Sequence, residues 1–177
     1  MTSYRRITIP GATYFFTVNL LDRRSKLLTE RIETLREAVA WVRKAHPFKI
    51  DAWVVMPDHL HAVWTLPTGD SNYALRWASI KRRFSFALPR EESLSQTRIR
   101  RVERGIWQRR FSEHLIRDDV DFQRHVDYIH FNPMKHGYVP RVADWPYSTF
   151  HRYVKHGMYP LDWGGIRAEH FDVGERK

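Results

Sequence analysis

Two histidines, His59 and His61, lie one residue apart in the segment MPDHLHAVW, which is otherwise mostly apolar. In a β-strand the side chains of residues i and i+2 project from the same face, so both imidazoles would point toward one ion. Neutral imidazole is a common metal ligand in proteins. For such a pair taken alone, however, two core histidines with satisfied hydrogen bonds are the simpler interpretation.

A second group of reactive residue types lies downstream, in DDVDFQRHVDYIHFNPMKHGYV. Phe122, Val126 and Ile129 recur at helical spacing and predict the packed face of a helix. Tyr128 and Asn132 are four residues apart and therefore share an adjacent face. A phenol that has lost its proton is a nucleophile, so Tyr128 could attack an electrophile held by the histidines. The simpler alternative is a tyrosine at the rim of the core.

The chain order of predicted elements is β-α-β-β-α-β-α. These elements are a strand at 13–21, a helix at 30–45 with Thr29 as N-cap, the strand-like runs KIDAWVVMP and HLHAVWTLP, a helix from about residue 72, a strand at 105–116, and a helix opened by Asp118 and Asp119. Residues 89–104 read as a basic loop, and about 140–177 as a C-terminal tail on the single domain 1–177. The pattern predicts an α+β fold: a ferredoxin-like or RRM-like split βαβ antiparallel sheet with helices on one face.

The composition points to an anionic partner. The 177 residues carry a formal net charge of +10, and the stretch from Arg76 to Arg110 holds eleven Lys and Arg against three Glu, interleaved with Trp and Phe. Such a region favours nucleic acid. The absence of cysteine excludes disulfides, zinc–thiolate sites and cysteine nucleophiles. No secretory signal or membrane-spanning stretch is evident, so we expect a cytoplasmic, nucleoid-associated protein.

The motifs together resemble a known family. PDHLH, followed by FSEHLIRDDVDFQRHVDYIHFNPMKHGYV and DWPYSTF, resembles the single-tyrosine HUH transposases of bacterial insertion sequences. Within that group the chain is most similar to the REP-associated tyrosine transposases, whose likeness extends to SYRRITIPGATYFFTVNL and YPLDWGG. The resemblance implies an RRM-like sheet with His59 and His61 as metal ligands and Tyr128 as nucleophile. Related transposases supply a glutamine as third ligand, and the matching residue here is Asn132, on a shorter stem and followed by Pro133.

The resemblance also implies the reaction. A bound Mg²⁺ or Mn²⁺ would polarise the scissile phosphate. Tyr128 would attack phosphorus, leaving a 5′-phosphotyrosine and a free 3′-hydroxyl that can later reverse the step. The substrate would be single-stranded DNA at a REP-type palindromic hairpin with a short guide tetranucleotide at its foot. The subgroup implies a monomer, although the broader family works as dimers.

Further residues are expected to contact DNA or support the site. Arginines and lysines would contact phosphates, and aromatic rings would stack on unpaired bases. The expected DNA contacts are Arg5, Arg6, Arg76, Lys81, Arg82, Arg83, Trp107, Arg109 and Arg110. Glu113 and His114, in the family's FxEH pattern, are expected to orient the site through a hydrogen bond to a ligand histidine or to serve structure. His125 and His130, both near Tyr128, could assist proton transfer, although helix position points His130 away.

Two other functions remain open from the sequence. The first is a nucleic-acid-binding module on an RRM-like sheet with no catalysis. The second is a metallo-nuclease that uses the same ligands but activates water instead of Tyr128. A denaturant-resistant protein–DNA adduct would separate the tyrosine mechanism from both.

Overall fold

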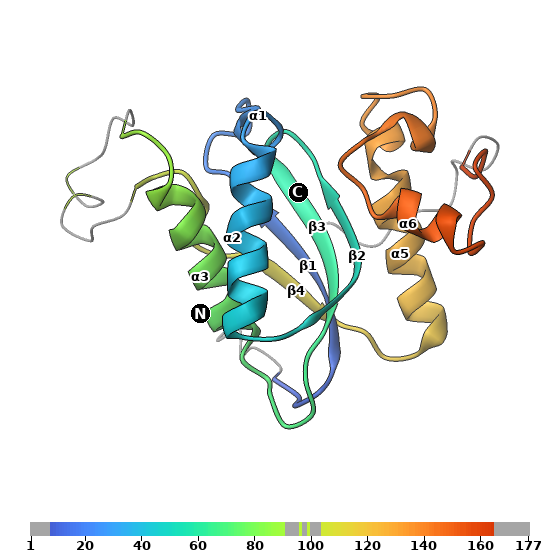
Figure 1. Cartoon of the computed structure of the whole chain (residues 1–177), viewed down its shortest axis with the longest axis horizontal. Helices are drawn as coiled ribbons and strands as arrows, with labels where there is room; N and C mark the ends of the chain where they lie inside the picture. Colours follow the sequence, from blue (N-terminus) through green and yellow to red (C-terminus); the bar gives the residue numbers. More distant parts are fainter. Residues whose placement is uncertain (1–7, 91–95, 97–98, 100–103, 165–177) are drawn as a thin grey trace, which may run out of the picture.

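The computed structural model describes residues 8–90, 96, 99 and 104–164. Its centre is a four-stranded sheet in the order β2-β3-β1-β4, with every neighbouring pair antiparallel (Figure 1). The strands are β1 (Thr13–Asn19), β2 (Lys49–Val55), β3 (His59–Thr65) and β4 (Ser112–Leu115). Strands β1 and β2 are separated by β3, which is the split βαβ arrangement that the sequence predicted.

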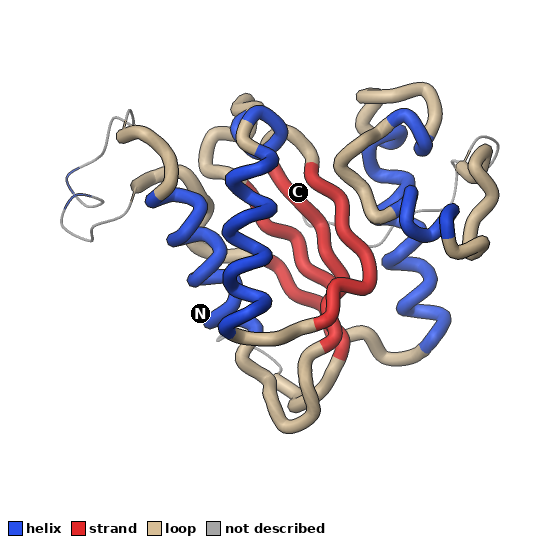
Figure 2. The backbone as a smooth tube through the Cα atoms, in the orientation of Figure 1, coloured by secondary structure: helices blue, strands red, loops and turns tan. Residues whose placement is uncertain are grey.

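Helices cover both faces of this sheet (Figure 2). They are α1 (Leu27–Glu30), α2 (Ile32–Ala45), α3 (Tyr73–Phe86), α5 (Asp119–Lys135), the 3₁₀ turn η1 (Val142–Asp144) and α6 (Phe150–Lys155). Along β1, Tyr14, Phe16 and Val18 enter the core under α2 and α3, whereas Phe15 enters the core under α5. Among the described helices, none is both long and apolar enough to cross a membrane.

The α+β class and the antiparallel sheet are confirmed, but the expectation that all helices share one face is wrong. Helices α2 and α3 lie on one face as predicted, and α5 and α6 pack on the other (Figure 1). In the sequence, the segment HLHAVW of β3 has no Lys, Arg, Asp or Glu, and in the structure its residues from His59 to Trp64 are all buried. A strand without an exposed alternate position requires cover on both faces.

Capping residues explain where two of the long helices begin. The Asn72 side chain accepts a hydrogen bond from the Leu75 N–H (3.0 Å) at the start of α3. Asp118 accepts one from the Asp121 N–H (2.8 Å) at the start of α5, as the sequence predicted. Thr29 is not an N-cap: it lies inside α1, and its hydroxyl donates to the Lys26 carbonyl.

Two other boundaries differ from expectation. The strand expected at 105–116 is shortened to β4, and its first part reaches the sheet only through a single bridge between Trp107 and Leu20. Most of the basic loop expected at 89–104 lies outside the described residues.

The segment after α5 packs back on the domain. The Thr149 hydroxyl accepts from the Trp53 N–H (2.8 Å), and the Thr149 N–H donates to the Trp53 carbonyl (2.8 Å), which closes part of the β2 edge. Phe150 and Tyr153 enter the core beside α5. Residues 165–177 of the expected tail lie outside the described residues.

A buried arginine ties the ends of α2 and α3 together. Arg76 is 1% exposed, and its guanidinium donates to both carboxylate oxygens of Asp70 (3.1 and 2.7 Å). It also donates to the carbonyls of His46, Pro47 and Asn72. The planar fork of arginine suits such convergent acceptors. Arg76 is therefore committed to the fold and does not belong to a DNA-contacting surface.

We expect Arg76→Met to lower the free energy of unfolding by about 2–4 kcal/mol, because it leaves a carboxylate and several carbonyls without their donor. Denaturant unfolding measures the change. The matched control Arg82→Met alters an exposed residue of the same helix and should shift stability by no more than about 0.5 kcal/mol. Equal effects of the two substitutions would contradict the structural role of Arg76.

Candidate metal and nucleophile site

The two histidines of β3 lie on the sheet face that α5 covers. Leu60, Ala62 and Trp64 enter the opposite core, so the alternating residues His59 and His61 face α5. Both are buried, and their ring centroids are 5.0 Å apart. The two imidazoles thus converge as strand geometry predicts.

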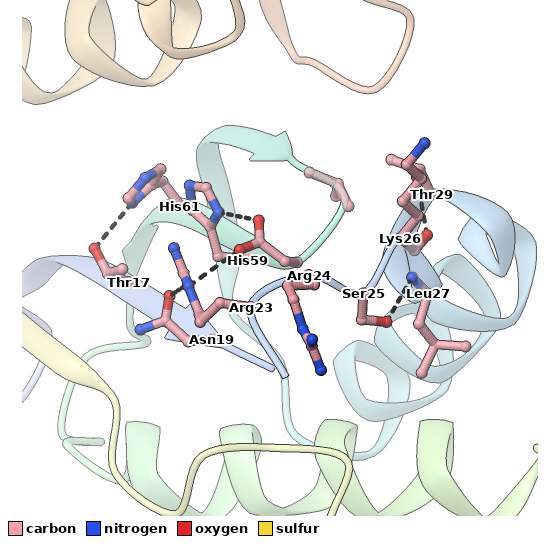
Figure 3. Close-up of polar contacts among 12 residues, drawn as sticks. Thr17, Asn19, Arg23, Arg24, Ser25, Lys26, Leu27, Thr29, His59 and His61 are labelled. Carbon is pink, nitrogen blue, oxygen red and sulfur yellow. Dashed lines mark hydrogen bonds and ion pairs between the residues drawn. The ribbon is translucent and has the colours of Figure 1, made fainter. Parts of the chain in front are cut away.

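The Nδ1 atom of each imidazole contacts a polar side chain (Figure 3). His59 Nδ1 lies 2.7 Å from Asp58 Oδ1, and His61 Nδ1 lies 2.9 Å from Thr17 Oγ1. Asp58 is also paired with Arg23 Nε at 3.0 Å. Because these contacts engage Nδ1, Nε2 is the nitrogen that each ring would offer to a metal ion.

The Asp58 carboxylate is ionised in this environment. Burial alone would raise the pKa of Asp58, but the hydrogen bond from His59 and the charges of His59 and Arg23 outweigh it, and the pKa falls below its usual value. An anion behind His59 makes that imidazole a better electron donor. Neither Asp58 nor Thr17 stood out in the sequence, although Asp58 directly precedes the first histidine.

Helix α5 places a tyrosine against this pair. The Tyr128 ring lies 5.3 Å from the His61 ring, edge to face, and the residue is 1% exposed. Two turns further along, the His136 ring lies 5.4 Å from that of His59. The helix therefore runs along β3, with Tyr128 over one histidine and His136 over the other.

Asn132 occupies the turn of α5 between these two contacts. It is four residues from Tyr128 and four from His136, so it lies on the same side of the helix. The side chain is fully buried, and within the described part of the chain neither of its amide atoms has a hydrogen-bond partner. Pro133 does not displace it, because α5 continues to Lys135.

The buried amide tests whether a metal ion fits here. An unpaired buried amide costs about 1–3 kcal/mol, which a native fold rarely tolerates without a purpose. One amide oxygen and two imidazole nitrogens make a donor set that Mn²⁺ or another divalent ion accepts. The residues present therefore fit a metal ion held by His59, His61 and Asn132.

Lys135 lies near the tyrosine but was not among the site residues that the sequence predicted. Lys135 Nζ lies 4.7 Å from the centroid of the Tyr128 ring. The spacing of seven residues, which places two side chains on one helix face, was the signal that could have found it. A cation at this distance stabilises negative charge on the phenol oxygen and on a phosphate beside it.

The expected supporting residues divide between the two faces of the sheet. His114 of β4 is the register partner of Phe15 in β1, and the His125 ring contacts the Phe15 ring. Both histidines therefore lie on the sheet face that carries His59 and His61. Glu113 pairs with Phe16 in register, which places it on the opposite face. His114 Nε2 lies 2.8 Å from Asp121, and burial lowers the pKa of His125.

His130, considered for proton transfer, points away from the tyrosine site. Its Nε2 lies 3.0 Å from Thr149 Oγ1, and its ring packs against Tyr153. Burial lowers the pKa of His130 to about 3, so the ring stays neutral across the physiological range. We assign it to the packing between α5 and the segment after it.

The expected DNA contacts are dispersed. Arg82 and Arg83 are exposed on α3, which covers the face opposite the histidines, and they lie over the rings of Phe86 and Trp41. Lys81 donates to the Gln108 carbonyl (2.9 Å) and Trp107 to Ser85 (3.2 Å), so both also serve the fold. The pair Arg109 and Arg110 is exposed just before β4. Arg5 and Arg6 lie outside the described residues.

Comparisons with known proteins identify full-length relatives. The chain is 49% identical over 176 residues to a REP-associated tyrosine transposase of Escherichia coli, covering 99% of this chain and 98% of the relative. A Haemophilus influenzae protein assigned to the same group is 49% identical over 166 residues, covering 93% of this chain and 94% of that protein. A solved structure of such a transposase bound to a REP hairpin matches with a TM-score of 0.85 and 48% identity, covering 100% and 99% of the two chains. No family model matches the chain.

If Asn132 is a metal ligand, Asn132→Leu should abolish tight Mn²⁺ binding while raising stability without metal by up to about 1–3 kcal/mol, because the unpaired amide is removed. Calorimetric titration measures the first effect and denaturant unfolding in chelator the second. A variant that is less stable and still binds Mn²⁺ like the wild type would show that Asn132 serves structure alone.

Proposed function

The chain belongs to the REP-associated tyrosine transposases, and we propose that it cleaves and rejoins single-stranded DNA at REP-type hairpins through a covalent bond to Tyr128. Its motifs predicted this family, whose members are named as transposases and are therefore DNA strand transferases. The observation that carries the proposal is the contact of the Tyr128 ring with His61, one helical turn from the buried Asn132 amide.

His59, His61 and Asn132 would hold Mg²⁺ or Mn²⁺. When bound, such an ion supplies positive charge that polarises the scissile phosphate and offsets the charge developing there. Asp58 and Thr17 orient the two imidazoles by fixing their Nδ1 atoms, so little reorganisation is needed on binding.

Tyr128 would act as nucleophile. Its oxygen, after losing the proton, attacks phosphorus; the bond from phosphorus to the 3′ oxygen breaks, and that oxygen takes up a proton to become a free hydroxyl. The 5′ phosphate remains on the tyrosine. In the reverse step a 3′-hydroxyl attacks the phosphotyrosine and releases the phenol, so the number of phosphodiester bonds is conserved.

Lys135 would support this step from the same helix. Its ammonium, 4.7 Å from the Tyr128 ring centroid, favours the phenolate over the phenol and attracts the phosphate to the nucleophile. Since both residues project from α5, their relative position is set by the helix itself.

A REP-type hairpin is the proposed substrate, because the solved relative is bound to one. Arg109 and Arg110 lead into β4, next to the strand that carries Phe15, and are proposed phosphate contacts. Arg5, Arg6, Arg82 and Arg83 would extend the contact. We propose that the chain acts as a monomer, and a chromosomal hairpin as substrate implies a nucleoid location.

A non-catalytic nucleic-acid-binding module is the second candidate. The exposed pairs of Arg83 with Trp41 and Arg82 with Phe86 favour binding by stacking and charge without any metal. They lie over the face that carries neither His61 nor Tyr128. Binding through them alone would leave the buried metal and tyrosine site without a purpose.

Tyr128→Phe should abolish cleavage of a labelled REP-type hairpin and the denaturant-resistant adduct, because the nucleophilic oxygen is gone, while hairpin affinity changes by less than about twofold. Gel electrophoresis with Mn²⁺ scores both products. Tyr147→Phe, which removes a hydroxyl outside the site, serves as control and should retain the adduct. Persistent nicking in Tyr128→Phe would instead support a water-activating nuclease.

We expect Lys135→Gln to slow adduct formation about 10–100-fold with little change in hairpin affinity, since the cation acts mainly on charge that develops in the reaction. Single-turnover cleavage measures the rate. Lys155→Gln removes an exposed lysine of α6 and is the matched control. If both variants slow the reaction equally, the effect is one of overall charge and the role of Lys135 is refuted.

A further inference from the structure

Three ligand-type side chains meet where β4 connects to the first turns of α5. His114 Nε2 lies 2.8 Å from Asp121 Oδ2, and His125 Nδ1 lies 3.1 Å from Asp121 Oδ1. One ligand atom from each residue can be chosen so that all three lie within 4.8 Å of one another. Among the residues that the structure describes, these three side chains form the group of His, Cys, Asp and Glu whose spacing could hold a metal ion.

This cluster is distinct from the tyrosine site. The Phe15 ring lies 4.7 Å from the His125 ring and 5.5 Å from the His61 ring, so an aromatic side chain contacts both groups. The cluster shares no ligand with His59, His61 and Asn132. It is also open to solvent, because the His114 side chain is 35% exposed and that of Asp121 is 19% exposed.

We propose that His114, Asp121 and His125 form a second metal site, which takes a transition-metal ion of the Zn²⁺ type. Two imidazoles and one carboxylate with an open position for water are a donor set typical of zinc. Like the site proposed for cleavage, this one offers two imidazoles and one oxygen, but its oxygen belongs to the Asp121 carboxylate instead of a neutral amide.

The donor atoms must move closer together to accept the ion. Ligand bonds of about 2.0–2.1 Å at tetrahedral angles separate donor atoms by about 3.3 Å. His114 and His125 contact different oxygens of Asp121, at 2.8 and 3.1 Å, and the three donor atoms lie within 4.8 Å of one another, so side-chain rotation has to gather them around one ion. On binding, the ion replaces the protons at His114 Nε2 and His125 Nδ1, and each neutral ring carries its proton on the other nitrogen. His125 Nδ1 thereby gives up the hydrogen bond that it now donates to the Asp121 backbone carbonyl (2.8 Å).

The position of the cluster gives the ion a structural consequence. His114 comes from β4, whereas Asp121 and His125 come from α5, so a bound ion would join the sheet to the helix. Tyr128 follows His125 by three residues, about one helical turn. Metal binding would thus fix the part of α5 that carries the nucleophile and would stabilise the folded chain.

The test measures metal stoichiometry and needs no DNA, so it is independent of the proposed cleavage. We expect calorimetric titration with Zn²⁺ to give about two equivalents for the wild type and about one for the His59→Ala/His61→Ala variant, which lacks the first site. In that background His114→Ala or Asp121→Asn should weaken the remaining binding at least tenfold and remove the Zn²⁺-induced rise in Tm. His156→Ala, at an exposed histidine outside the cluster, should not.

Two results would overturn the proposal. One is a His59→Ala/His61→Ala variant that folds and binds no Zn²⁺; the other is binding that survives both His114→Ala and Asp121→Asn. If the double variant fails to fold, His114→Ala in the wild-type background decides, because it should reduce the stoichiometry from about two to about one. A stoichiometry unchanged there would mean that the cluster is a hydrogen-bonded clamp only.

Discussion

The packing of α5 along the central strand β3 is the contact on which the site depends. It sets the Tyr128 ring against His61 and the His136 ring against His59, and it buries the amide of Asn132, which lies on the helical turn between those two residues. The opposite face of β3 is apolar, and there Leu60 and its neighbours pack under α2 and α3. A two-sided sheet thus holds its polar residues between layers that exclude water.

Burying polar residues costs free energy, and hydrogen bonds within the fold offset this cost for some of them and not for others. The two imidazoles are compensated through Asp58 and Thr17, each of which engages an Nδ1 atom. The amide of Asn132 has no such compensation among the described residues. Unpaired buried groups lower stability, and functional sites are where folds tolerate them. The uneven compensation suits a ligand-binding site, since the Oδ1 atom of Asn132 is left for a cation.

Some basic residues of the chain make internal contacts and others are exposed, and composition cannot separate the two groups. Arg76 belongs to the first group, because its guanidinium joins the ends of two helices. Arg82 and Arg83 are exposed over the sheet face that lies away from the histidines. Arg109 and Arg110 lie at the approach to β4, next to the central strands. A run of basic residues along the sequence is therefore not one basic surface in space.

The sequence by itself determined what local periodicity can determine. The alternation of a strand made His59 and His61 share a face, the helical repeat did the same for Tyr128 and Asn132, and the order of elements predicted the split βαβ sheet. Only the tertiary structure decided that α5 covers the opposite face from α2 and α3, and that Asp121 joins histidines from two elements. Periodicity states which side chains share one face of an element. Which faces meet depends on packing between segments distant along the chain, and no local pattern contains that information.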